Sequence, residues 1–201
     1  MNSNNPQKPA PDTYDIIFRE EERFAREAAL ALLVTRDLPL WRTAIPGMFL
    51  LDFLERGKMI RRIRSYYLPP RSAALAAAQN PGGKPSGGEM TAESLEELHT
   101  DITALLRQNG GSRQALFRLV SALADHYATL AAEDGYTFAA LAENAYENAK
   151  EFEAIEQQIC RLESEWSAAV RSETGIAPIP ENHMQEFIAR RQRRAEQIFS
   201  A

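Results

Sequence analysis

The sequence predicts an all-α protein folded as an up-and-down helical bundle. Ala, Leu, Glu, Arg and Gln dominate the 201-residue chain, and the alternating β-branched runs that are typical of strands are absent. Apolar residues recur at helical spacing along most of the chain. The last four predicted helices are separated by short connections, which favour antiparallel neighbours.

The N-terminal part of the chain is predicted to hold a tail and two helices. Residues 1–13 are polar and contain prolines, so we expect a disordered tail. The first helix is predicted over 14–35. The second is predicted over 46–68, because a proline suits its first position and the pair that begins at Pro69 should end it. Residues 14–79 thus form an N-terminal helical region.

A loop over residues 80–90 is rich in glycine and proline, and we expect it to be flexible. It precedes a predicted helical bundle over residues 91–201, and we expect both helical regions to pack as one domain. Four helices are predicted in the bundle from their apolar periodicity and their caps, over 91–108, 112–132, 138–173 and 182–199.

The long predicted helix over 138–173 carries a seven-residue apolar repeat that only Asn148 interrupts. Such a stripe, which we call the association seam, needs long helical partners. The first two helices of the chain or a second copy would cover it, and we predict a homo-oligomer or a helical protein partner. The seam residues are Phe138, Leu141, Ala145, Phe152, Ile155, Ile159, Leu162 and Trp166.

The charge of the chain is distributed unevenly. The net charge is -5, yet residues 56–88 contain seven Lys or Arg and no Asp or Glu, whereas residues 91–173 contain fifteen Asp or Glu and six Lys or Arg. We call residues 56–71 the basic strip. Its candidate residues for binding an anionic partner are Arg56, Lys58, Arg61, Arg62, Arg64, Tyr66, Tyr67 and Arg71.

Three uses of the basic strip are open. Positive charge beside aromatic rings suits contact with nucleic-acid phosphates and bases. Apolar residues earlier in the same helix, such as Phe49 and Phe53, would instead let it lie on an anionic membrane surface. The third use is internal, with the arginines paired to acidic residues of the same chain.

Evidence for catalysis in the sequence is weak. Glu96 and His99 form one E-x-x-H step, but di-iron bundles need this step twice. Glu143, Glu147 and Glu151 repeat every four residues, a spacing more typical of a solvated stripe than of a metal site. No nucleophile or phosphate-loop motif is present. We therefore predict no catalytic residue, metal or cofactor, and a metal-dependent helical-bundle hydrolase is the less favoured alternative.

Segments that would direct the chain to a membrane or out of the cell are not evident. Residues 1–13 lack the apolar stretch of a secretory signal, and no apolar run approaches the ~18–20 residues needed to cross a bilayer. Cys160 is the only cysteine, so no intrachain disulfide can form. We expect a cytoplasmic, non-catalytic interaction or assembly protein, with nucleic-acid or anionic-membrane binding through the basic strip as the alternative.

Overall fold

The computed structural model describes residues 12–34, 48–79, 110–175, 177, 179 and 181–200. Within these residues the chain forms helices and no strand, so the predicted all-α fold class is confirmed. Residues 1–11 of the predicted tail, the Gly/Pro loop and the predicted helix over 91–108 lie outside the described residues, and Thr13, the last residue of the predicted tail, belongs to the first helix. The helices are α1 (Thr13–Val34), α2 (Met48–Gln79), α5 (Gly111–Ala131), α6 (Phe138–Ala145), α7 (Ala149–Thr174) and α8 (Glu181–Phe199).

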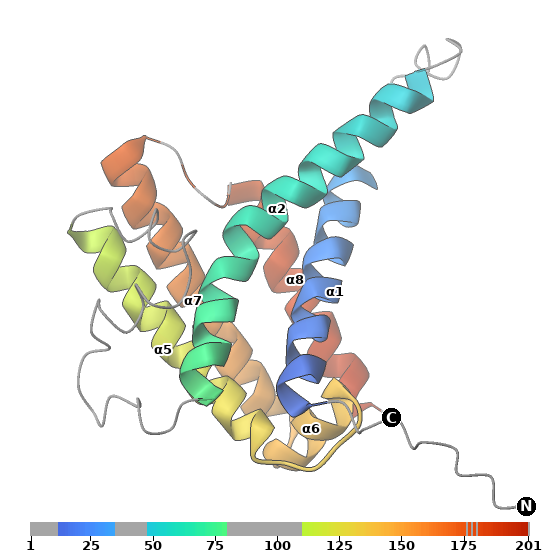
Figure 1. Ribbon diagram of the computed structural model, residues 1–201, viewed down its shortest axis with the longest axis vertical. Helices are drawn as coiled ribbons and strands as arrows, with labels where there is room; N and C mark the ends of the chain where they lie inside the picture. Colours follow the sequence, from blue (N-terminus) through green and yellow to red (C-terminus); the bar gives the residue numbers. More distant parts are fainter. Residues whose placement is uncertain are drawn as a thin grey trace, which may run out of the picture.

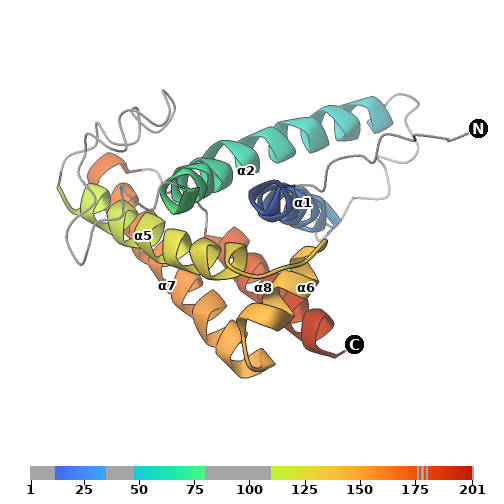
Figure 2. The same ribbon diagram turned by 60° about the horizontal axis from the view of Figure 1, so that its bottom comes forward.

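Several of the packed pairs of helices run antiparallel. α1 and α2 form one antiparallel pair, and α7 lies antiparallel to both α5 and α8 (Figure 1). The α1–α2 pair packs on the other helices mainly through contacts of α2 with α5 and of α1 with α8 (Figure 2). The N-terminal half of α2 runs beside the end of α1 and extends away from α5, α7 and α8 (Figure 1). This half of α2 is therefore the least enclosed part of the described fold.

Helix α2 continues through Pro69 and Pro70, so the prediction that these prolines end it was wrong. A proline inside a helix costs about 3 kcal/mol because it lacks an N–H and its ring crowds the preceding turn. Here a buried face runs uninterrupted past the prolines, from Ile63 through Tyr67 to Ala74. The burial of that face against α1 and α5 offsets the cost, and tertiary packing overrides the local signal.

The predicted long helix over 138–173 is two helices, α6 and α7, and this prediction also was wrong. Tyr146 and Asn148 adopt extended backbone conformations between them. The Asn148 side chain accepts hydrogen bonds from the N–H groups of Lys150 and Glu151 at 3.0 and 3.1 Å, which makes it the N-cap of α7. Because of this break, α6 turns away from the axis of α7 and lies against the ends of α1, α5 and α8 (Figure 2).

The ends of α5 and α7 are joined by polar contacts. The N–H of Ser112, in the first turn of α5, donates to Glu173 of α7 at 3.0 Å, and the Ser112 hydroxyl donates to the same carboxylate. Gly175 ends α7 with φ of 75°, a left-handed conformation that glycine adopts without strain. These contacts fix the register of the antiparallel α5–α7 pair.

Candidate functional site

The structure divides the basic strip into two halves. Tyr66, Tyr67 and Arg71 are buried in the interior, with at most 6% of each residue exposed. They therefore do not form part of a surface for an anionic partner, and their inclusion in that surface was wrong. We call these three residues the buried half of the strip.

Lys58, Arg61 and Arg64 form the exposed half of the strip, since all three are solvent-exposed. Arg64 makes an ion pair with Glu22 of α1. Lys58 and Arg61 make no ion pair with any residue that the structure describes. Arg56 and Arg62 belong to α2, but their side chains lie outside the described residues. The prediction that this half binds an anionic partner stays a prediction.

The association seam is covered by the chain's own helices. Phe138 and Leu141 of α6 and Phe152, Ile159 and Trp166 of α7 are buried, and α5 and α8 pack along α7. The remaining seam residues are partly buried against the same core, and they are Ala145, Ile155 and Leu162. The seam therefore stabilises the monomer and leaves no continuous apolar stripe for a second copy.

A cluster of six charged side chains lies at the centre of the bundle, and we call it the buried charge cluster. It contains three carboxylates and three guanidinium groups, so its formal charge is zero. Each residue is at most 6% exposed. The members come from α1, α2, α7 and α8, and they are Glu21, Arg71, Glu156, Glu163, Arg191 and Arg194.

Arg71 of α2 joins two other helices. Its Nε donates to Glu21 of α1 at 2.7 Å and its Nη2 donates to Glu163 of α7. The Tyr67 hydroxyl donates to the same Glu21 oxygen at 2.7 Å, and the Arg71 guanidinium carbon lies 3.4 Å from the centre of the Tyr67 ring. The buried half of the strip thus supplies a cation and an aromatic plane to the interior of the protein.

Helix α8 supplies the other two guanidinium groups. Arg191 donates to Glu156, to Glu163 at 3.2 Å and to the Tyr67 hydroxyl at 3.3 Å. Arg194 donates to Glu156 as well. Glu163 of α7 is therefore shared between a cation from α2 and one from α8, whereas Glu156 is bonded to two cations from α8.

The electrostatics of the cluster favour charged side chains. Burial alone would raise the pKa of Glu21, but the nearby Arg71, Arg194 and Arg191 outweigh it and lower the pKa to about 2. Burial likewise opposes ionisation of Glu156, yet the arginines hold its pKa well below the ordinary value. Carboxylates with such low pKa values are poor proton acceptors near neutral pH. The cluster therefore suits a structural role better than acid–base catalysis.

Sequence reasoning did not identify the carboxylates of the cluster, although a signal was present. Glu156 and Glu163 are seven residues apart, and each directly follows a seam position. The buried face of α7 is rotated by one residue from the apolar repeat, so it includes these two carboxylates, whereas Ile155 and Leu162 are only partly buried. Glu156 and Glu163 share the seven-residue spacing of the apolar seam residues, and this shared spacing could have indicated that both carboxylates are buried.

The candidate metal ligands do not form a site among the described residues. Glu96 and His99 lie outside the described residues. The helix break places Glu143 on α6 and Glu151 on α7, and Glu147 between them. The described part of the chain holds no group of three His, Cys, Asp or Glu side chains that could bind a metal ion.

His126 and Cys160 are both buried, and burial holds them in uncharged forms. Burial is the main cause that lowers the pKa of His126 to about 4, and its Nδ1 lies 2.6 Å from the Tyr146 hydroxyl. Burial also raises the pKa of Cys160 to about 12, so its thiol is a weak nucleophile.

No described helix is both long enough and apolar enough to cross a bilayer. Comparisons with known proteins found no matching family model, curated protein or solved structure.

Proposed function

We propose that the protein is a non-catalytic interaction protein that binds an acidic helical partner in the cytoplasm through the exposed half of the basic strip. The observation that carries the proposal is the position of Lys58 and Arg61. Both are exposed and unpaired among the described residues, on the half of α2 that runs beside the end of α1 and extends away from α5, α7 and α8 (Figure 1).

The composition of this surface favours a helical partner. Met59 and Ile60 are half-buried beside the two exposed cations, and Leu30 of the adjoining α1 is one of the few large apolar side chains exposed in the described structure. A helix with carboxylates flanking an apolar face would match this arrangement. Within the described part of the strip two cations are unpaired, compared with the roughly six to ten phosphate contacts of a typical DNA-binding protein.

A second copy of the chain is one partner of suitable charge. Glu143 and Glu147 are exposed at the corner between α6 and α7. Contact between this corner and the basic face of α2 would be head-to-tail and would not use the seam. Light scattering of the wild type and of a Glu143→Lys variant distinguishes self-association from a different partner, because only self-association requires the acidic corner.

Photo-crosslinking in cells tests the proposal directly. A photoreactive amino acid replaces Lys58 or, as a control, the exposed Gln114 of α5. We expect a discrete protein adduct from position 58 that is absent from position 114 and is lost when Arg61→Glu is added. Equal adducts at both positions, or no adduct at either, would contradict the proposal.

Gel-shift and liposome assays test the alternative. Binding to a DNA duplex or to phosphatidylserine vesicles that falls steeply with salt, and that Arg61→Glu removes, would favour an anionic non-protein partner. That result without a protein adduct would replace the proposed function with the alternative.

A further inference from the structure

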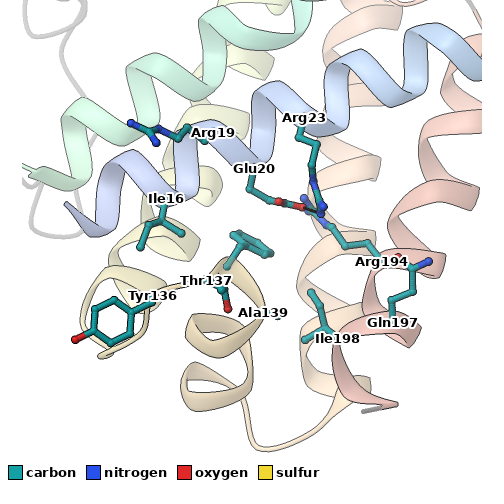
Figure 3. A pocket seen from close by; sticks show the side chains of 11 residues that line it. Ile16, Arg19, Glu20, Arg23, Tyr136, Thr137, Ala139, Arg194, Gln197 and Ile198 are labelled. Atoms are coloured by element: carbon teal, nitrogen blue, oxygen red, sulfur yellow. Dashed lines mark hydrogen bonds and ion pairs between the residues drawn. The ribbon is translucent and has the colours of Figure 1, made fainter. Parts of the chain in front are cut away.

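A pocket of about 530 Å3 lies between α1, the start of α6 and the end of α8 (Figure 3). This volume is in the range of sites that hold small organic molecules. Ile16, Phe138 and Ile198 supply apolar walls from the three helices. The pocket can therefore cover the apolar body of a small ligand.

The charges that line the pocket are mainly positive. Arg19, Arg23 and Arg194 line it together with a single carboxylate, that of Glu20. Figure 3 shows Arg194 reaching from α8 toward Glu20 and Arg23, so that three charged groups meet at one end of the pocket. The lining has a formal charge of +2, and anions are favoured there.

Arg194 is a rigid anchor for this end of the pocket. It is 6% exposed, it donates to Glu156 on its inner side, and its guanidinium carbon lies 5.0 Å from the centre of the Phe138 ring. Its Nη1 lies 3.7 Å from a Glu21 oxygen in an ion pair, and its Nε is buried without a hydrogen bond to any described residue. These contacts hold the positive charge of Arg194 in a fixed position at this end of the pocket.

The other two arginines have exposed guanidinium groups. Arg23 is bonded to Glu20 at 2.6 Å, and Arg19 lies 3.4 Å from Asp15, but both arginine side chains are more than half exposed. The Arg19–Asp15 pair is exposed on both sides, and such pairs contribute about 0–1 kcal/mol, whereas the Glu20 side chain is only 12% exposed. An incoming anion therefore competes with the Glu20 carboxylate for the exposed guanidinium of Arg23.

We propose that this pocket binds a small amphipathic anion, with its anionic group held by Arg23 and Arg194 and its apolar body against Ile16, Phe138 and Ile198. Glu20 competes with the ligand for the same cation. Removal of the Arg23 charge should thus weaken binding, whereas removal of the Glu20 charge should strengthen it. On a nonspecific apolar surface, removal of the Arg23 charge and removal of the Glu20 charge would not change the affinity in opposite directions.

Fluorescence titration with anilinonaphthalene sulfonate, an aromatic anion, tests the charge dependence. We expect Arg23→Gln to weaken binding roughly fivefold and Glu20→Gln to strengthen it by a similar factor, with the uncharged analogue N-phenyl naphthylamine insensitive to both. The controls are Arg26→Gln and Glu143→Gln, which remove exposed charges outside the pocket and should change affinity less than about twofold. Equal effects of Arg23→Gln and Arg26→Gln, or weaker binding by Glu20→Gln, would overturn the proposal.

Mapping by NMR locates the probe on the wild-type protein and needs no variant to fold. Addition of the sulfonate should shift the backbone amides of residues 136–139 and 197–198. A second groove, between α7 and α8, is lined by Ser164, Met184 and Ile188 and serves as the internal comparison. Shifts confined to that groove, or no saturable shifts anywhere, would overturn the assignment.

Discussion

The two halves of the basic strip lie on one helix but perform opposite tasks. Arg61 is exposed and unpaired among the described residues. Arg71, ten residues later, is buried and bonded to two carboxylates from two other helices. The comparison shows that a run of positive charge can mark the interior of a bundle as well as its surface. Which task an arginine performs depends on the helices that pack beside it.

The largest expected difference between the halves is in stability. Arg71→Met should lower the free energy of unfolding by about 3–5 kcal/mol, because it leaves Glu21 and Glu163 buried without one of their cations. Arg61→Met is the matched control and should change it by less than about 0.5 kcal/mol. Urea unfolding followed by circular dichroism measures both, and similar losses from the two variants would break the comparison.

Acid should destabilise the protein through two buried groups, Glu21 and His126. The pKa of Glu21 is lowered from 4.5 to about 2, so the stability that its charge provides is complete above pH 4.5 and is lost as the pH falls toward 2. The contribution is about 3 kcal/mol. Because the pKa of His126 is lowered from 6.5 to about 4, its contribution is lost earlier, as the pH falls from 6.5 to 4.

Unfolding free energies measured from pH 7 to pH 2 separate the two groups. His126→Asn should flatten the profile above pH 4.5, and Arg71→Met should flatten it below, since Arg71 is the largest of the arginine influences that lower the pKa of Glu21. A wild-type profile that stays level throughout would show that the buried carboxylates do not depend on their cations.

Arg64 is the member of the exposed half that makes an ion pair. It is paired with Glu22, but its side chain is 49% exposed. Arg64→Met should cost about 0.2–1 kcal/mol, and the loss should shrink in high salt because exposed pairs are screened. Thermal unfolding at low and high NaCl concentration measures the loss of stability in Arg64→Met. A loss comparable to that of Arg71→Met would show that burial does not determine how much an arginine of the strip contributes to stability.

The smallest effect on stability is expected for charge reversal in the exposed half. Lys58→Glu combined with Arg61→Glu should shift the free energy of unfolding by less than about 0.5 kcal/mol while it removes partner binding. Thermal unfolding of this variant measures its stability, and the photo-crosslinking assay at position 58, carried out with Arg61→Glu alone, measures partner binding. A large loss of stability would mean that these side chains belong to the folded core.

The sequence was sufficient to predict the fold class and several helices. The predicted helices over 14–35, 112–132 and 182–199 agree closely with α1, α5 and α8, because their caps and apolar faces are local signals. The continuation of α2 through Pro69 and the break before Asn148 were not predicted. The continuation of α2 depends on packing against distant helices, which a single sequence does not display, whereas the break had a local signal in Asn148, the N-cap of α7.

The buried charge cluster was only partly predictable for the same reason. Pairing of the strip with acidic residues of the same chain was one of the open alternatives, and Arg71 with Glu163 is an instance of it. The partners are 92 residues apart in sequence. Local patterns identified the arginine but offered no way to choose its carboxylate.

A double-mutant cycle between Arg71 and Glu163 tests most directly whether the buried half of the strip stabilises the bundle through its ion pairs. The unfolding free energies of the wild type, Arg71→Met, Glu163→Gln and the double variant give the coupling energy between the two side chains. We expect a favourable coupling of about 1–3 kcal/mol, because each single variant leaves the buried charge cluster with a net charge, whereas the double variant restores its formal charge to zero. Single effects that simply add, with a coupling near zero, would contradict the account.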